Sequence, residues 1–250
     1  MLYIEEFLNR TMSKQIEVVV ASREDANDKK DFINNVIETC GCECEIHFVY
    51  NAEGKSLTEI YNEYIEATDG GCNLVVYIHD DIEFLRYGWG LKLLELFSKH
   101  EDYGIIGVAG AAQYDEKGMW WNYEKKYGQV LHRQKGRSWL TTFSPLLDKD
   151  LEEVCVVDGI FIAVRKDRIS QPFDEDFQGF NHYDTSFCIA NYLDAETRIG
   201  VTTDIRIAHS SIGETKQNFF DNLKILNEKY HEYYPIDVEE DNKLEASGKL

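Results

Sequence analysis

The sequence predicts an α/β protein in which helices flank a mostly parallel central sheet. Short runs rich in Val, Ile and aromatic residues alternate with segments whose apolar residues recur at helical spacing. Strands that alternate with helices form parallel sheets through right-handed crossovers. The chain has 250 residues, 43% of them hydrophobic, enough for one sizeable core. We therefore expect a single domain over residues 1–235, followed by a charged tail over residues 236–250.

The first half of the chain repeats a strand followed by a helix. The expected strands are β-branched runs at residues 16–21, 44–50, 73–79 and 103–112. The expected helices carry their apolar residues on one side, at residues 28–39, 57–67 and 89–97. The strand YGIIGVAGAA ends in small residues, which allow close approach of another backbone.

The pattern changes after residue 112. Residues 113–150 are rich in Trp, Tyr, Gly and charge without clear periodicity, which predicts a loop-rich insertion beside a site. Strand character returns in VCVVDGIFIAVRK, YDTSFCIANYL predicts a buried helix, and RIGVTTDIRIAHSS predicts a strand pair or one long strand. The charged end of the chain has few large apolar residues, so we expect it to be frayed.

The net charge restricts the partners. Asp and Glu number 46 against 26 Lys and Arg, a formal charge of −20, which repels nucleic acid and anionic membrane surfaces. A phosphorylated ligand would need a metal ion, helix N-termini or a few convergent basic side chains. No apolar run is long enough to span a bilayer, and the start, MLYIEEFLNR, lacks the apolar core of a signal peptide. We expect a cytoplasmic protein that binds no nucleic acid.

Six cysteines in such a chain are expected to be reduced thiols. Cys40, Cys42 and Cys44 could supply thiolates to zinc, but their spacing is not the C-x-x-C of zinc knuckles and no second ligand pair follows nearby. Packing as small apolar side chains is the favoured interpretation.

The third expected strand runs into His79, Asp80 and Asp81. Ligands of open parallel sheets bind beyond the carboxyl ends of the strands. Alternation would place His79 and Asp81 on one face and Asp80 on the other, provided that the strand geometry persists. A carboxylate there, without an evident basic partner, suits Mg²⁺ or Mn²⁺ that shares its shell with substrate phosphates. The alternative is that the two aspartates only begin a turn.

Further polar residues follow in FDEDFQGFNHYDTSF and IAHSS. Asp184 stands in the first turn of the expected helix, where the helix dipole favours a carboxylate even without a function. His209 ends an apolar strand, either as a metal ligand or as a structural residue. Asp158 precedes Gly159, either beside a site or as a turn acid.

These ordered pieces resemble the nucleotide-sugar glycosyltransferases of the GT-A fold, close to the large family-2 group that includes rhamnosyltransferase-like proteins. The resemblance spans roughly residues 17–213 and is carried by YIHDDIEF followed by Trp89, GVAG, VVDGIFIAVRK, FDEDFQGFNHYDTSFCIA and IAHSSIG. It implies a Rossmann-like sheet and metal-dependent, inverting transfer of a sugar from a nucleoside diphosphate donor to an acceptor hydroxyl of a glycan or related molecule, as in polysaccharide biosynthesis.

The resemblance also implies roles for single residues. Asp81 would bind the Mn²⁺ or Mg²⁺ on the donor diphosphate, with His209 as a further metal ligand, and Asp184 would be the catalytic base. His79 stands where the first acid of an Asp-x-Asp motif is usual. The implied contacts to the nucleotide sugar are Ala21, Ser22, Arg23, Asn51, Asn62, His79 and Asp80. The acceptor side is expected at Asp158, Trp120 and Trp121.

Two other classes fit part of the pattern. A non-catalytic glycan- or nucleotide-binding protein on the same fold could use the aromatic segment after residue 112, and a pure glycan binder has no reason to bind nucleotides through a metal. A nucleotidyltransferase would need a glycine-rich, basic loop after the first strand, and ASREDANDKKD contains no glycine. The donor base, the sugar, the acceptor and the oligomeric state stay open.

Overall fold

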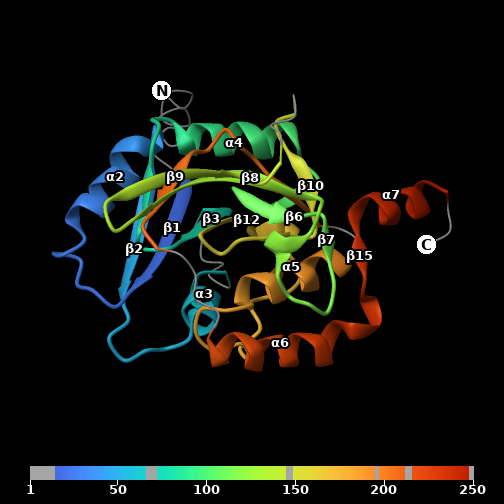
Figure 1. Ribbon diagram of the computed structural model, residues 1–250. Coiled ribbons are helices and arrows are strands. Elements are labelled where there is room, and N and C mark those ends of the chain that lie inside the picture. Colours follow the sequence, from blue (N-terminus) through green and yellow to red (C-terminus); the bar gives the residue numbers. More distant parts are fainter. Residues whose placement is uncertain (1–14, 66–71, 145–148, 195–196, 212–215, 248–250) are drawn as a thin grey trace.

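The computed structural model describes residues 15–65, 72–144, 149–194, 197–211 and 216–247. Within these residues, the centre is a seven-stranded sheet in the order β10–β13–β5–β12–β3–β1–β2 (Figure 1). Its strands are β1 (Ile16–Ser22), β2 (Cys44–Tyr50), β3 (Leu74–Ile78), β5 (Tyr103–Gly107), β10 (Glu152–Val154), β12 (Phe161–Arg165) and β13 (Arg198–Val201). All run in one direction except β10 and β12, which pair antiparallel with their neighbours. The predicted mostly parallel α/β sheet is confirmed.

A second described sheet has the order β11–β6–β8–β14–β4, with β9 paired to β8. Its strands are β4 (Ile82–Phe84), β6 (Ala109–Ala111), β8 (Lys126–Gln134), β9 (Arg137–Thr142), β11 (Val156–Val157) and β14 (Ile207–His209). The predicted strand 103–112 is therefore divided between two sheets. The expected close backbone approach is present, because a Cβ on Gly110 would lie 2.1 Å from the carbonyl oxygen of Val156.

Helices cover both faces of the central sheet (Figure 1). On one side lie α2 (Lys30–Cys40) and α4 (Trp89–Lys99), which contact each other. On the other side lie α3 (Leu57–Ile65), α5 (Tyr183–Leu193) and α6 (Gln217–Tyr230). Short 3₁₀ turns complete the connections, at η1 (Trp120–Asn122), η2 (Lys166–Arg168) and η3 (His231–Tyr233). No helix within the described ranges is long and apolar enough to cross a bilayer.

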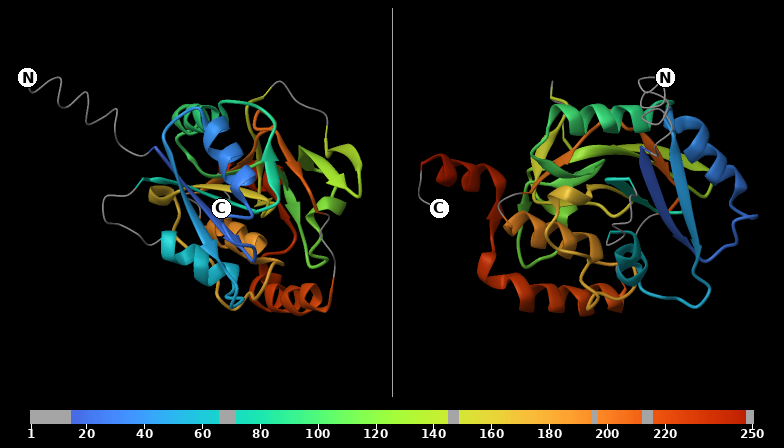
Figure 2. Two further views of the ribbon diagram at one scale, coloured as in Figure 1. Left: turned by 90° about the vertical axis from the view of Figure 1, so that its left-hand side faces the viewer. Right: turned by 180° about the vertical axis from the view of Figure 1, so that it is seen from behind.

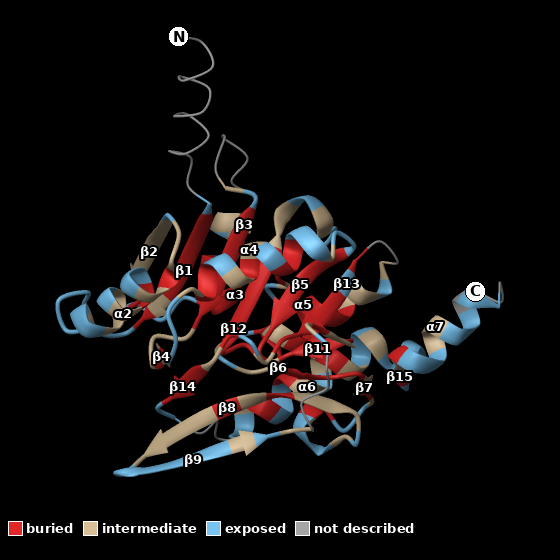
Figure 3. Ribbon diagram, turned by 90° about the horizontal axis from the view of Figure 1, so that it is seen from above, coloured by how far each residue is buried: buried red, intermediate tan, exposed pale blue. Residues whose placement is uncertain are grey.

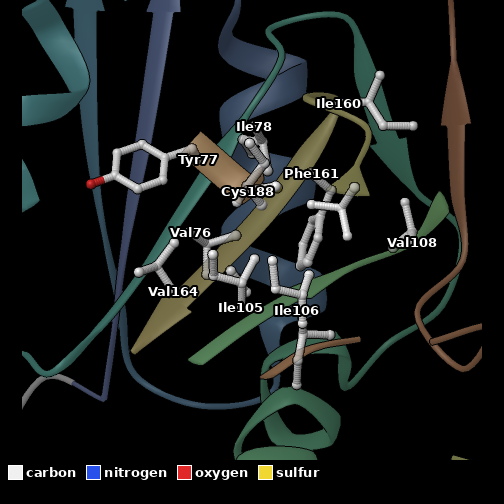
Figure 4. Close-up of a cluster of buried hydrophobic side chains, with 14 of the residues drawn as sticks. Val76, Tyr77, Ile78, Ile105, Ile106, Val108, Ile160, Phe161, Val164 and Cys188 are labelled. Atoms are coloured by element: carbon white, nitrogen blue, oxygen red, sulfur yellow. The ribbon is translucent and has the colours of Figure 1, made fainter. Parts of the chain in front are cut away.

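The core lies between these layers, and the central strands are buried on both faces (Figure 3). Side chains from β3, β5 and β12 interdigitate there with Cys188 of α5 (Figure 4). Burial of one such aliphatic side chain contributes roughly 1.5–3 kcal/mol of transfer free energy. Strands buried on both faces read as continuous apolar runs, which is why they were visible in the sequence. This core fixes the carboxyl end of β3, where the polar residues begin.

The segment 113–150 is more regular than expected. Where the sequence predicted a loop-rich insertion, β8 and β9 form a hairpin with residue-by-residue pairing from Gln129–Thr142 to Gln134–Arg137. The hairpin was missed because both strands have few buried residues, so their alternation between apolar and polar positions is weak.

The expected frayed tail is wrong for most of its length. The strand β15 (Ile236–Asp237) pairs antiparallel with β7 (Gln113–Tyr114), and α7 (Val238–Ala246) follows and extends away from the body (Figure 2). Ile236 and Val238 are each only 3% exposed. Two buried side chains thus fasten a segment whose overall composition is polar.

The described cysteines are free thiols, as expected. Cys40 is fully buried, and Cys42 and Cys44 are half-buried against the core. The Sγ atoms of Cys40 and Cys42 lie 3.5 Å apart, next to Gly90 of α4. The favoured packing role is consistent with this position, although β2 begins only at Cys44.

Candidate active site

His79, Asp80 and Asp81 form the short turn between β3 and β4, at the carboxyl end of β3. The amide of His79 still donates to the carbonyl of Ile160, so the strand pairing extends one residue beyond β3. His79 and Asp81 point toward His209, whereas Asp80 points toward Ser22 and Lys29. The structure therefore places the two aspartates on opposite sides, as alternation predicts.

Three side chains converge at this edge. One ligand atom from each of His79, Asp81 and His209 lies within 4.8 Å of the others, and we call these residues the His–Asp group. His209 is brought there by β14, which pairs antiparallel with β4. Its Nε2 lies 3.2 Å from Oδ1 of Asp81 and 3.1 Å from the hydroxyl of Ser211. Two imidazole nitrogens and one carboxylate are a set of ligands that could hold a divalent cation.

The charges of the His–Asp group depend on one another. Burial is the largest single effect and opposes ionisation of Asp81, but the hydrogen bonds from His209 and Ser211 and the charges of His209 and His79 together outweigh it and hold the pKa of Asp81 well below its usual range. The same pairing raises the pKa of His209 against the effect of its burial. Burial, together with the neighbouring His209, lowers the pKa of His79. A bound cation would compete with the proton that the hydrogen bond between His209 and Asp81 requires.

Asp184 lies in the first turn of α5 and is half-buried. Its Oδ2 accepts a hydrogen bond of 2.8 Å from the amide of Gly159, and its Oδ1 accepts one of 2.8 Å from the amide of Thr185. Burial, followed by repulsion from Asp158, raises the pKa of Asp184 to about 7. A carboxylate with such a pKa can accept a proton near neutral pH.

Tyr183 and Gly159 connect Asp184 to the His–Asp group. The hydroxyl of Tyr183 donates to the carbonyl of Gly159 over 3.1 Å and lies 3.3 Å from Nε2 of His79. Gly159 has no room for a side chain, since a Cβ would lie 2.2 Å from that hydroxyl. Two hydrogen-bonding residues therefore separate the imidazole of His79 from the carboxylate of Asp184.

Asp158 occupies the turn between β11 and β12. Its Oδ1 accepts a hydrogen bond from the amide of Ile160, so it has the turn role that was one of its two interpretations. Its charge also acts on His79, His209 and Asp184. Asp158 thus acts electrostatically on both the His–Asp group and Asp184.

The residues expected beside the nucleotide are only partly brought together. Ser22, which ends β1 after the half-buried Ala21, donates to Asp80. The ammonium of Lys29 lies 3.4 Å from the carboxylate of Asp80, a basic partner that the sequence analysis missed. Arg23 lies over the ring of Phe180, 5.4 Å from its centroid. The contacts of Ser22 and Lys29 with Asp80 lie on the side of the turn that faces away from His209.

The side chains of Asn51 and Asn62 do not join these contacts, although the backbone amide of Asn51 donates to the carbonyl of Ser22. The side chain of Asn51 bonds to the backbone amide and carbonyl of Lys55 and closes its own loop. Asn62 bonds in the same way to Phe173 and anchors the loop before α5. Both side-chain amides already have backbone partners. These hydrogen bonds explain why polar residues stand at positions 51 and 62, without the need for a ligand.

The two tryptophans expected on the acceptor side differ. Trp120 is 5% exposed and packs on Phe143, so it is a core residue and is not available to a sugar. Trp121 is 38% exposed and contacts Phe219 of α6. Of these two, Trp121 alone presents an accessible aromatic surface.

The structure adds two residues to the site: His132, which the sequence analysis missed, and Trp139, which it placed only in the aromatic segment after residue 112. β8 pairs parallel with β14, which places His132 beside His209, with ring centroids 6.3 Å apart. Trp139 of β9 stacks on the other side of His132, at 5.4 Å and 24°. Only the pairing of β8 with β14 brings them to the site, and no local motif signals it.

A second set of possible cation ligands, Glu17, Glu45 and His47, lies on β1 and β2 near their amino ends, opposite the His–Asp group. The carboxylate of Glu17 is 3.2 Å from the ammonium of Lys166, which already balances its charge. The His–Asp group is the better candidate for a functional metal site.

Residues 17–230 match a family described as glycosyltransferase like. No curated protein matches the chain. Among solved structures, the chain is similar to 4-diphosphocytidyl-2C-methyl-D-erythritol synthase from Anaerococcus prevotii DSM 20548, with 10% identity, a TM-score of 0.30, and coverage of 86% of this chain and 96% of that chain. Since the family match covers most of the chain, this protein belongs to the glycosyltransferase-like family and has a Rossmann-like α/β fold of the GT-A type.

Proposed function

We propose that this chain is a metal-dependent, inverting glycosyltransferase that moves a sugar from a nucleoside diphosphate donor to an acceptor hydroxyl of a glycan or related molecule. Within its family we place it close to the rhamnosyltransferase-like members of the family-2 group. The observation that carries the proposal is the short connection, through Tyr183 and Gly159, between the His–Asp group and Asp184. The His–Asp group, at one end of this connection, has ligands for a cation that would bind the diphosphate. Asp184, at the other end, is a carboxylate that could act as the base.

The residues of the His–Asp group would hold the cation. Tyr183 orients the imidazole of His79, and Ser211 contacts that of His209, as outer partners of metal ligands commonly do. When bound, the cation would neutralise charge on the departing diphosphate. Two imidazoles suit Mn²⁺ better than Mg²⁺, which prefers oxygen ligands throughout.

Asp184 would act on the acceptor. Its carboxylate takes the proton of the acceptor hydroxyl while the hydroxyl oxygen forms a bond to the anomeric carbon. The bond between that carbon and the diphosphate oxygen breaks, and the electron pair leaves with the diphosphate. Attack opposite to the leaving group inverts the anomeric configuration. The raised pKa of Asp184 supports this role, because the base must be ionised but still basic near neutral pH.

The acceptor would approach past Asp158 and the exposed ring of Trp121, since aromatic faces pack on sugar rings. We place the reaction in the cytoplasm, in polysaccharide biosynthesis. The alternative is a glycan-binding protein without turnover on the same fold. Metal-dependent nucleotide binding separates the two, because a glycan binder needs neither the cation nor the nucleotide.

The test is a thermal-shift panel of UDP, GDP, CDP and dTDP, each with and without Mn²⁺. A nucleotide at about 100 times its Kd stabilises the protein by about 2.7 kcal/mol, or roughly 5–10 °C for a chain of this size. We expect such a shift for one base, only with Mn²⁺. It should vanish in Asp81→Asn and persist in Asp102→Asn, a matched change at an exposed carboxylate paired with Arg198. No shift with any nucleotide would overturn the proposal.

A further inference from the structure

The β8–β9 hairpin presents an imidazole at the edge of the His–Asp group. His132 and His209 are register partners on the parallel strands β8 and β14, which lie side by side (Figure 3). Their ring centroids are 6.3 Å apart. Trp139 stacks on the opposite side of the His132 ring. The ring is therefore held between a member of the His–Asp group and an aromatic platform.

One nitrogen of His132 has no protein partner. Its Nδ1 is buried, yet no hydrogen bond satisfies it among the described residues. A buried polar atom without a partner costs free energy, so such an atom beside a site indicates a ligand or an ordered water. Asp158, whose charge reaches His132, makes its hydrogen bond to the amide of Ile160 instead.

His132 lies outside the His–Asp group. The ligand atoms of His79, Asp81 and His209 lie within 4.8 Å of one another, and His132 is not a member of that set. Adjacent strands are about 4.8 Å apart, so His132 stands one strand spacing beyond His209. An oxygen of a phosphate on a divalent cation lies about 2 Å from the cation, and the rest of the phosphate extends further.

We infer that His132 is a binding residue for the diphosphate of the donor, donating a hydrogen bond from Nδ1–H to a phosphate oxygen on the hairpin side of the His–Asp group. This inference rests on the proposed function. A neutral imidazole donates from one nitrogen, and a hydrogen bond to an anionic oxygen is stronger than one to a neutral acceptor.

Charge in this region favours such a donor. The chain carries a formal −20, and Lys29, on the other side of the turn, is already paired with Glu24 and Asp80. Uncharged N–H donors on a rigid support then become important for an anionic ligand. The support is present, because the ion pair of Arg133 with Glu83 ties β8 to β4 across β14.

The test measures two affinities by isothermal titration of the full chain: that for Mn²⁺ alone, and that for inorganic pyrophosphate in the presence of Mn²⁺. Pyrophosphate carries the diphosphate without a base or sugar. His132→Phe keeps a ring against Trp139 but removes the donor, and His132→Asn keeps an N–H group near the position of Nδ1. Arg137→Ala, an exposed change on the same hairpin, is the control.

We expect His132→Phe to weaken pyrophosphate binding about tenfold or more, while its affinity for Mn²⁺ stays that of the wild type. His132→Asn should retain most of the affinity, and Arg137→Ala all of it. Unchanged pyrophosphate binding in His132→Phe would overturn the inference. So would a loss of affinity for Mn²⁺ alone, which would make His132 a metal ligand, or equal losses in the Phe and Asn variants, which would indicate a packing role.

Failure of the proposed function would be visible in a different experiment, the nucleotide panel on the wild-type protein. It would show in the wild type, as the absence of Mn²⁺-dependent binding for every nucleotide of the panel. Failure of this inference alone would show only in the His132 variants, with nucleotide binding by the wild type intact.

Discussion

Asp81 and Asp184 lie at the same edge of the central sheet, but their surroundings shift their pKa values in opposite directions. Asp81 has a hydrogen-bonding imidazole beside it, which stabilises the carboxylate. Asp184 has another carboxylate, Asp158, near it and accepts hydrogen bonds from the amides of Gly159 and Thr185 and the hydroxyl of Thr185, but no cationic partner is among the causes of its shift, so burial dominates. Two identical side chains thus become a permanent anion and a group that titrates near neutrality, which is how one site can contain both a cation ligand and a base.

Among the tests of this difference between Asp81 and Asp184, the largest expected effect is the loss of sugar transfer in Asp184→Asn. The amide keeps the shape of the side chain but cannot accept a proton, so sugar transfer should fall by roughly 10²- to 10⁴-fold. Nucleotide binding with Mn²⁺, measured by titration, should stay within about twofold of the wild type, because the His–Asp group is intact. Near-normal transfer by this variant would remove Asp184 as the base.

The identity of the cation tests the other side of the comparison. We expect the wild type to bind its nucleotide more tightly with Mn²⁺ than with Mg²⁺, because His79 and His209 supply nitrogen ligands. His79→Asp replaces one nitrogen by oxygen and should improve Mg²⁺-dependent affinity by about tenfold. His231→Asp, an equal exchange at an exposed position, should change neither value. Equal affinities with the two cations in the wild type would contradict the assignment of His79 as a ligand.

The third expected effect is on how stability varies with pH. The pKa of Asp184 is about 7 in the folded chain against an ordinary 3.8, so between these values the folded state holds a proton that the unfolded state has released. Asp184 should therefore make stability fall as pH rises from about 4 to about 7, by at most about 1.4 kcal/mol per pH unit, and add no further slope above that.

Urea unfolding of the wild type and Asp184→Asn across this range measures that slope. The variant should lack the fall, and equal slopes in the two proteins would disprove the shift. The other titratable groups that face Asp184 are Asp158, Tyr61, Tyr114, Tyr183 and Cys188. Burial raises the pKa of the four tyrosine and cysteine groups above their ordinary values, so they stay neutral here. Asp81 acts in the opposite sense, since its lowered pKa contributes stability above pH 3.8 that is lost on acidification.

Much of the fold was predictable because it depends on residue patterns within short stretches of the sequence. The continuous apolar runs of β1, β3 and β12 and the helical spacing in α2 and α3 are properties of short windows. The opposite orientations of Asp80 and Asp81 followed from alternation alone. The partners of these residues did not, since Lys29 reaches Asp80 from 51 positions away in the chain.

The errors share one cause. The division of residues 103–112 between two sheets, the β8–β9 hairpin and the anchoring of Ile236 each depend on a distant strand that offers a pairing edge. A short stretch of sequence contains no information on the distant strand with which it will pair. Weakly patterned segments such as β8 and β9 therefore look like loops until their partners are known.

By itself, the sequence determined the α/β alternation, the carboxyl end at which His79 and Asp81 emerge, and the helix that begins beside Asp184, because periodicity and β-branched composition act over a few residues. The tertiary structure decided which side chains share a space. It placed His209 against Asp81 and His132 against His209, and it left Asp184 half-buried near Asp158 with a raised pKa. The physical reason is that burial and electrostatic coupling depend on distance in space, and β14 and α5 acquire their neighbours only when the chain has folded.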